Sequence, residues 1–152
     1  MGEAGGINQS LKPGDIVLCT KALRDEGTSH HYIKSSKYAY PDSKLTSDIS
    51  KGMRRENTEF LRGATWSTDA PYLETVEEVR KYSSSKIYTV DMEASALFAI
   101  AQRRGIAAAA VFLVSDVLRL DSEYSGFAHE SESYLKGFAS MTAVIRAFAS
   151  QR

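Results

Sequence analysis

Short apolar runs alternate with amphipathic stretches along the chain. Runs rich in β-branched and aromatic residues, bounded by turn residues, predict buried strands. The first run follows Lys12-Pro13-Gly14-Asp15, a turn signal in which proline presets φ and glycine relaxes it. The predicted strands cover residues 16–20, 60–66, 87–90 and 106–114.

Apolar positions recur at helical spacing between and after these runs. Ala94, Leu97, Phe98 and Ala101 fall on one face of a 3.6-residue period, and Gly105 follows where a helix prefers to end. The predicted helices cover residues 44–53, 74–82, 92–104 and 129–150.

Strands that alternate with helices favour an α/β domain with a largely buried sheet. The chain has 152 residues, enough for one core and too few for two ordinary domains. We therefore expect residues 1–152 to form a single α/β domain. Residues 24–42 are polar and aromatic without periodicity, which predicts a long loop, and loops of that length are usually functional or mobile.

Composition excludes several classes of protein. Hydrophobic residues make up 43% and charged residues 25%, as in globular proteins. Lys+Arg and Asp+Glu both number 19, so binding of nucleic acid through a bulk basic surface is not expected. Cys19 is the only cysteine, which excludes an intrachain disulfide and suits a reducing compartment; in its strand it fits a buried apolar group better than a nucleophile.

No membrane or secretory signal is found in the sequence. The longest apolar stretch, residues 106–114, has nine residues, whereas a membrane-spanning helix needs about 20. The first six residues lack the basic start and apolar core of a signal peptide. We therefore expect a soluble, cytoplasmic protein with no membrane partner.

Two acidic stretches stand where predicted strands end, the usual place for ligand sites in open α/β sheets. Asp91 and Glu93 lie at a strand-to-helix junction, and Asp116, after Ser115, follows the last apolar run. Loss of solvation there favours a protonated carboxyl, which suits Asp116 to act as a general acid. Both stretches have a structural alternative, because carboxylates also cap helices and turns.

Other polar residues give weaker signals. The glycine-rich residues 2–6 offer backbone N–H groups to an anion, but Glu3 among them repels phosphate. His30 and His31 are adjacent and cannot both face one ligand from a regular strand, and His129 has no obvious partner. No metal site is expected.

Several short motifs, in order and spanning nearly the whole chain, together resemble one family: the purine/uridine nucleoside phosphorylase and nucleosidase superfamily. The motifs are Gly2-Glu3-Ala4-Gly5-Gly6-Ile7-Asn8, Leu11-Lys12-Pro13-Gly14-Asp15-Ile16-Val17, Asp25-Glu26-Gly27-Thr28-Ser29, Thr65-Trp66-Ser67-Thr68-Asp69-Ala70-Pro71-Tyr72, Val90-Asp91-Met92-Glu93-Ala94-Ser95-Ala96-Leu97-Phe98 and Val114-Ser115-Asp116. The resemblance implies a phosphorylase/hydrolase-like three-layer sandwich with a central mixed sheet flanked by helices, truncated at its N-terminus.

The resemblance also implies a role for individual residues. Met92 matches a methionine that packs on ribose, and Glu93 a glutamate that accepts hydrogen bonds from the 2′- and 3′-hydroxyls. Asp116 matches an aspartate that protonates, or hydrogen-bonds to, N7 of a departing purine. Tyr72 matches an aromatic residue at the base, with proline in place of the phenylalanine before it. The other substrate-binding residues that we assign within these motifs are Gly5, Asp91 and Ser115.

The implied reaction is phosphorolysis of a purine-type nucleoside to free base and ribose 1-phosphate, with phosphate as co-substrate and no cofactor. Family members begin with a further N-terminal half that contains phosphate-binding arginines, and Glu3 replaces the serine or threonine that touches phosphate. A sheet without that half should leave open edges and apolar faces. We therefore expect a homo-oligomer, or a partner that supplies the missing half.

Three hypotheses stay open on the sequence alone. The chain is a purine-type nucleoside phosphorylase or the catalytic half of one, a phosphate-independent nucleosidase, or a non-catalytic truncated relative. Phosphate dependence of base release separates the first two, and nucleoside binding without base release indicates the third.

Overall fold

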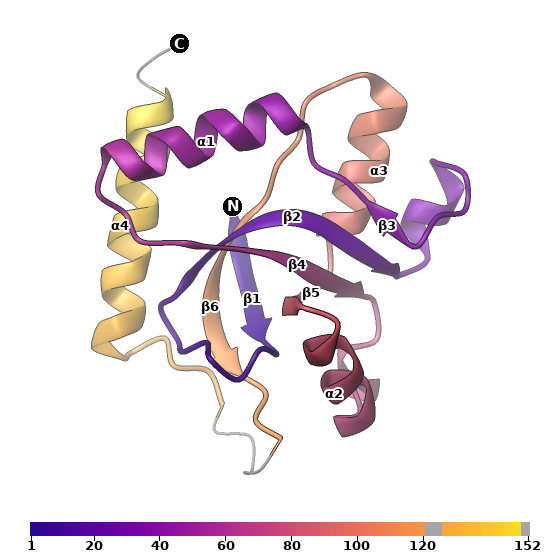
Figure 1. Cartoon of the computed structure of the whole chain (residues 1–152), viewed down its shortest axis with the longest axis horizontal. Helices are drawn as coiled ribbons and strands as arrows, with labels where there is room; N and C mark the ends of the chain where they lie inside the picture. The colour runs from indigo at the N-terminus through magenta and orange to yellow at the C-terminus, as the bar shows by residue number, and fades with distance from the viewer. Residues whose placement is uncertain (121–125, 150–152) are drawn as a thin grey trace.

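The computed structural model describes residues 1–120 and 126–149, and Figure 1 shows the arrangement of their elements. The strands are β1 Gly2–Gly6, β2 Ile16–Asp25, β3 Tyr38–Ala39, β4 Leu61–Thr68, β5 Ile87–Asp91 and β6 Val111–Val117. The α-helices are α1 Ser43–Arg55, α2 Val76–Ser84, α3 Ala94–Arg104 and α4 Glu132–Ala149, and the 3₁₀ helices are η1 Thr28–His31 and η2 Pro71–Leu73.

The strands form one mixed sheet in the order β3-β2-β4-β5-β1-β6. β2 pairs in parallel with β4, β4 with β5, and β1 with β6, whereas β1 runs antiparallel to β5. The start of β2 also pairs antiparallel with β6, so the sheet curls back on itself. The expectation of open edges is therefore wrong for β2 and β6, each of which has neighbours on both sides.

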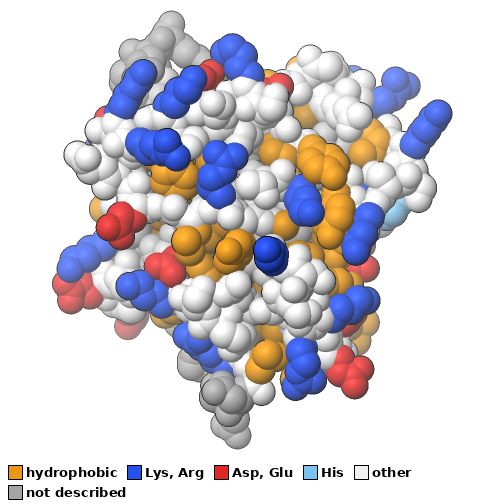
Figure 2. Space-filling model, viewed as in Figure 1, with side chains coloured by type: hydrophobic (Ala, Val, Ile, Leu, Met, Phe, Trp, Pro, Cys, Tyr) orange, Lys and Arg blue, Asp and Glu red, His pale blue; other side chains and the backbone are white. Residues whose placement is uncertain are grey.

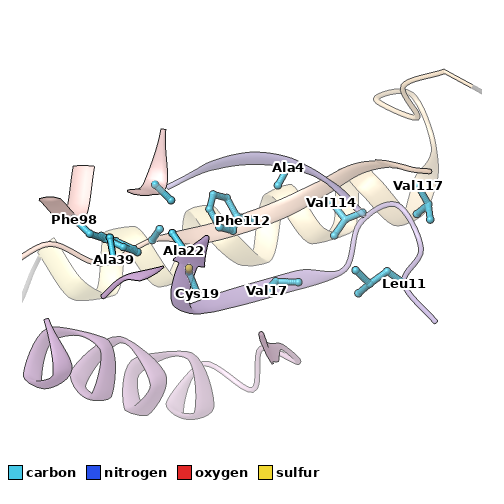
Figure 3. Packing of buried hydrophobic residues seen from close by; sticks show 12 residues of the cluster. Ala4, Leu11, Val17, Cys19, Ala22, Ala39, Phe98, Phe112, Val114 and Val117 are labelled. Carbon is cyan, nitrogen blue, oxygen red and sulfur yellow. The ribbon is translucent and has the colours of Figure 1, made fainter. Parts of the chain in front are cut away.

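Helices cover the curled sheet on several sides, and apolar clusters fill the spaces between. One cluster, drawn in Figure 3, joins β1, β2, β6 and α3 through residues such as Cys19, Phe98, Phe112 and Val114. A second joins α1 and α4 to β2 and β6. A third joins α2 to β4 and β5 around the fully buried Trp66. The expected mixed sheet flanked by helices is confirmed.

One apolar face has no cover within the described residues. Leu135, Phe138 and Ile145 lie on one side of α4 and are 55%, 53% and 45% exposed. Their spacing of three and seven residues is that of one helix face. This face belongs to a helix and not to the sheet, so the expected open faces of the sheet stay a prediction.

Helix boundaries follow local capping. The Asp42 carboxylate accepts the backbone N–H of Leu45 at 2.7 Å and starts α1. Thr75 and Glu78 form a capping box at the start of α2. Gly105 ends α3 in the left-handed region, at φ 66°, which glycine adopts without strain. All four predicted helices are confirmed within a few residues, except that residue 150, assigned to the last one, lies outside the described residues.

Three details of the sequence-based prediction are wrong. Residues 106–110 are not strand, because the chain leaves α3 at Gly105 and first joins the sheet at Val111. The Gly2–Gly6 segment is strand β1 and not an anion-binding loop, since it pairs with β5 and β6. The long loop is interrupted by η1 and β3. Within the described residues, no helix is long and apolar enough to span a membrane.

Candidate active site

Asp116 lies inside β6, opposite Gly5 of β1 in the parallel pairing. The side chain is buried, and its Oδ1 accepts a hydrogen bond from Ser115 Oγ at 2.6 Å. A Cβ built on Gly5 would lie 3.6 Å from Oδ2 and 3.8 Å from Oδ1. Oδ2 accepts no hydrogen bond from the described residues, so glycine at position 5 leaves this oxygen open to a donor or a ligand.

β1 separates the two acidic stretches. Gly5 pairs with Val90 of β5 on one side and with Asp116 on the other. At a strand spacing of about 4.8 Å, the Cα atoms of Val90 and Asp116 are about 10 Å apart. β5 and β6 run in opposite directions, so their carboxyl ends do not meet at one edge of the sheet. Instead, the register of β1 with both strands brings Asp116 near the turn that follows Val90.

Asp91 holds that turn together. Its Oδ1 accepts hydrogen bonds from the hydroxyls of Thr65 and Ser67 at 2.9 and 2.8 Å. Its Oδ2 accepts the backbone N–H groups of Glu93 and Ala94 at 3.0 and 2.6 Å. Both oxygens of the Asp91 carboxylate thus accept hydrogen bonds that hold the start of α3, as expected for a capping carboxylate, the structural alternative given by the sequence. The assignment of Asp91 to substrate binding stays a prediction.

Met92 and Glu93 project from the same turn and are exposed. The Glu93 carboxylate has no hydrogen bond to any described residue and is available to a ligand. Tyr72, in η2, is 100% exposed and makes no packing contact that would fix its ring. The assignments of Met92, Glu93 and Tyr72 to substrate binding stay predictions, and so do those of Gly5, Ser115 and Asp116.

A buried polar network behind the site was missed by sequence reasoning. Glu26 accepts Ser95 Oγ at 2.5 Å and the backbone N–H of Ser29 at 2.9 Å. Ser67 Oγ accepts the backbone N–H of Ser95 at 3.1 Å. Burial would raise the pKa of Glu26, but the hydrogen bonds from Ser29 and Ser95 outweigh it and lower that pKa. This network fixes α3 against β2 and β4, and with it the turn that carries Glu93.

A second missed cluster lies at the start of β1. Glu3 accepts a hydrogen bond from the Tyr134 hydroxyl, and its other oxygen lies 3.2 Å from His129 Nε2. The His129 ring stacks on Phe127 at 5.3 Å. Burial and the contact with Glu3 raise the pKa of Tyr134 to about 12. The expectation that His129 has no partner is therefore wrong, because folding joins residues 126 positions apart.

Cys19 takes no part in the site. It is fully buried in the core cluster of Figure 3. Burial, reinforced by the charge of Asp91, raises the pKa of the thiol to about 12, so it stays neutral and unreactive. The interpretation of Cys19 as a small buried apolar group is confirmed.

Two cavities among the described residues lie apart from the candidate site. Cavities of about 500 and 600 Å³ lie along α1 and beside the Lys12–Asp15 turn, away from Asp116 and Glu93. Figure 2 shows Lys and Arg side chains scattered over one face among apolar patches. Among residues 1–120 and 126–149, no three His, Cys, Asp or Glu side chains gather as a metal site.

The curled mixed sheet flanked by helices defines an α/β protein, in which the Asp116 and Glu93 carboxylates are the candidate ligand groups. The chain belongs to the phosphorylase superfamily, whose family model matches residues 1–149. The resemblance inferred from the motifs is thereby confirmed.

Known relatives share this fold. Guanosine phosphorylase of Halorubrum lacusprofundi is 31% identical over 113 residues, which are 74% of this chain and 47% of that protein. The purine nucleoside phosphorylase of Toxoplasma gondii, solved with immucillin-H, aligns with a TM-score of 0.85 at 18% identity, over 96% of this chain and 59% of that one. AMP nucleosidase of Bacteroides thetaiotaomicron aligns with a TM-score of 0.69 at 24% identity, over 98% and 60%. The chain spans about half the length of the curated relatives it matches.

Proposed function

We propose that this chain carries the base- and ribose-binding part of a site that cleaves the N-glycosidic bond of a purine-type nucleoside. The reaction is phosphorolysis, which gives free base and ribose 1-phosphate, with phosphate as co-substrate and no cofactor. The observation that carries the proposal is Asp116 Oδ2, an open carboxylate oxygen in a buried side chain in front of Gly5. The similarity to guanosine phosphorylase supports it.

Cleavage of this bond places positive charge on the ribose and negative charge on the base, and the site must stabilise both. Asp116 donates a proton or hydrogen bond to the ring nitrogen of the leaving base. Glu93 accepts hydrogen bonds from the ribose hydroxyls, and Met92 packs beside the sugar. Gly5, Ser115 and Asp91 shape the space between, and Tyr72 contacts the base.

Binding of the phosphate anion requires positively charged groups. The contacts around Glu3, itself a carboxylate, do not provide that charge. We propose that another copy in a homo-oligomer, or a partner, contributes the residues that bind phosphate. The exposed face of α4 is consistent with such an assembly.

Hydrolysis is the second candidate reaction, because the negative charge of the Glu3 carboxylate repels phosphate. A carboxylate that already binds Tyr134 and lies beside His129 suits the orientation of a water molecule. Base release that does not depend on phosphate selects this function.

The test is base release from inosine, guanosine, adenosine, methylthioadenosine and uridine, with and without phosphate, followed by chromatography. We expect purine release that depends on phosphate and is slow or absent with uridine. Absence of base release from every nucleoside, also after an N-terminal partner is added, overturns the catalytic proposal. A rise in melting temperature with purine nucleosides alone then identifies a non-catalytic, nucleoside-binding relative.

A further inference from the structure

Glu26 is a buried carboxylate to which the proposed function gives no role. It directly follows β2 and is 5% exposed. One oxygen, Oε1, accepts a hydrogen bond from Ser95 Oγ at 2.5 Å, and the other, Oε2, accepts the backbone N–H of Ser29 at 2.9 Å. A buried charge is costly unless hydrogen bonds compensate for the lost water, and hydrogen bonds to a charged group are the stronger ones. Glu26 is therefore bound firmly to both partners.

Ser95 ties the start of α3 to two separate parts of the sheet. Its backbone N–H donates to Ser67 Oγ of β4 at 3.1 Å, and its hydroxyl donates to Glu26 beyond the end of β2. Ser95 is fully buried, so its hydroxyl depends on a protein acceptor. Two anchors on different strands hold the helix start against both displacement and rotation, whereas a single anchor would leave it free to pivot.

The same contacts leave the Glu93 side chain free for a ligand. The first backbone N–H groups of a helix need acceptors, which nearby side chains usually supply. Asp91 Oδ2 accepts the N–H groups of Glu93 and Ala94, and Ser67 accepts that of Ser95. Glu93 is exposed, stands at the N-cap position and makes no capping bond with its side chain. Its placement is therefore set by where the start of α3 is held.

The partner on the other side of Glu26 is itself fixed by a buried cation. Arg24, 6% exposed, donates from Nε to Ser29 Oγ at 2.8 Å. Its Nη1 donates to Ser36 Oγ at 2.8 Å and to the Lys34 carbonyl at 2.9 Å, which holds the loop around the guanidinium. Ser29 thus contacts both charges, and its helix η1 packs beside α3 (Figure 1). Both oxygens of Glu26 are bound by groups that have further anchors.

We propose that Glu26 is a positioning residue for ribose recognition, which acts through the Ser95 hydroxyl to hold the start of α3 where Glu93 reaches the ribose hydroxyls. The inference rests on the proposed function, in which Glu93 binds the sugar, and it adds two buried residues that do not touch the substrate. Hydrogen bonds weaken steeply as their geometry departs from the optimum. A small shift of the helix start therefore weakens binding of the ribose although Glu93 is still present.

The experiment measures the dissociation constant of a nucleoside by calorimetry and needs no turnover. The probes are inosine and 2′,3′-dideoxyinosine, which lacks both hydroxyls that Glu93 binds in the proposed function. Ser95→Ala removes only the hydroxyl, and its backbone N–H can still donate to Ser67. We expect this variant to bind inosine about threefold to thirtyfold more weakly than wild type does, and dideoxyinosine equally well.

A double variant tests the route through Ser95. Glu26→Ala should weaken inosine binding by a factor similar to that of Ser95→Ala, because the Ser95 hydroxyl then has no acceptor. Glu26→Ala/Ser95→Ala should bind inosine no more weakly than the weaker single variant, since both changes break the same contact. Factors that multiply in the double variant overturn this route. Where Glu26→Ala does not fold, Ser95→Ala and Glu26→Gln decide.

Glu26→Gln separates position from stability. Its amide oxygen can accept Ser95 Oγ, but its NH2 group cannot accept the Ser29 N–H. We expect a chain less stable than wild type that still binds inosine within about threefold of wild type. Val144→Ala, in the cluster that joins α1 and α4 to β2 and β6, is the matched control, because it lowers the melting temperature away from the network. Equal weakening of inosine binding in Ser95→Ala and Val144→Ala overturns the proposal.

Failure of this inference and failure of the proposed function are distinguishable. A wild-type chain that binds inosine, with a Ser95→Ala variant that binds it equally well, overturns the positioning role alone. A wild-type chain that binds inosine and dideoxyinosine equally well contradicts the role of Glu93 in the proposed function. A wild-type chain that binds neither nucleoside overturns the proposed function and this inference with it.

Discussion

Gly5 and Asp116 pair across the parallel strands β1 and β6, and the Asp116 carboxylate lies beside the position that a Cβ at residue 5 would take, 3.6 Å from it at the nearer oxygen. Val90 closes the opposite side of that position. A ligand can therefore reach Asp116 only because residue 5 of the neighbouring strand β1 is a glycine, which has no side chain.

Gly5→Ala should impair activity more than stability. The added methyl group would lie 3.1 Å from Val90 Cγ1, tight enough to shift that side chain, and 3.6 Å from Asp116 Oδ2. We expect a loss of stability of about 1 kcal/mol from overpacking and a larger proportional loss of kcat/KM. Gly2→Ala in the same strand meets nothing within 4 Å and is the control. Equal activity of the two variants would show that the space beside Gly5 is not used.

Asp116→Asn should slow base release. Asparagine keeps the shape of the side chain and can still accept from Ser115, but it has no acidic proton to give. A general acid typically contributes about 10²- to 10⁴-fold, and we expect kcat to fall within that range. The measurement is initial rate against nucleoside concentration, with Asp48→Asn on the surface of α1 as control. A rate within a factor of about two of wild type would exclude Asp116 as the acid.

Glu93→Gln should weaken binding of the ribose. Hydrogen bonds to a charged group contribute about 1.5–3 kcal/mol each, and the amide keeps one acceptor oxygen without the charge. We expect KM to rise about tenfold for ribonucleosides, with a smaller rise for 2′-deoxynucleosides, which lack one of the two hydroxyls. Glu77→Gln is the matched control. An equal effect on both sugars would place Glu93 away from the 2′-hydroxyl.

The sequence predicts elements with strong local signals and misses those defined by pairing. The predicted α3 helix, 92–104, ends where the structure ends it, because Gly105 follows, and the predicted α2 helix, 74–82, lies within two residues of the observed bounds. β1 has the composition Gly-Glu-Ala-Gly-Gly, which carries no strand signal, and it is a strand only because β5 and β6 supply partners.

The site follows the same division. Asp116 and Glu93 are identified by sequence analysis as candidate site residues, because a carboxylate directly after an apolar run or before a predicted helix is a recognisable pattern. Glu26 and Glu3 are not, since their partners Ser95 and Tyr134 are 69 and 131 positions away and only folding joins them. Glu3 gives no signal of its own, because its side chain is about half exposed and water can solvate it, and its partners are His129, before α4, and Tyr134, in the first turn of α4.

Gly63→Ala tests the packing of β4 against β5. A Cβ at position 63 would lie 1.9 Å from Tyr88 Cδ2, so the Tyr88 ring must move out of its place in the sheet. Overpacking of this kind typically costs about 1–3 kcal/mol or more. Urea unfolding should show that loss, whereas Gly52→Ala, in the open interior of α1, should gain up to about 1 kcal/mol from helix propensity. Two variants of equal stability would contradict the close approach of Tyr88.

Glu26 should make the stability of the protein fall in acid. Its pKa is lowered in the folded state, because the hydrogen bonds from Ser29 and Ser95 favour the charged form over the cost of burial. The folded state therefore binds the proton less readily than the unfolded chain, whose glutamate titrates near 4.5. The stabilisation is complete above that pH and is lost as the pH falls through the lowered folded pKa.

Glu26→Gln removes this dependence, since an amide does not titrate. Its one oxygen can replace Oε1, which accepts Ser95 Oγ, but its NH2 group cannot accept the backbone N–H of Ser29 as Oε2 does. The expected result is a free energy of unfolding that is lower than wild type at neutral pH and approaches it as the pH falls below about 4.5. Urea titrations at a series of pH values measure the difference, and Glu77→Gln, exposed on α2, corrects for the remaining carboxyls. Curves for wild type and Glu26→Gln that stay parallel from neutral to acidic pH would mean that the bonds from Ser29 and Ser95 do not favour the charged form.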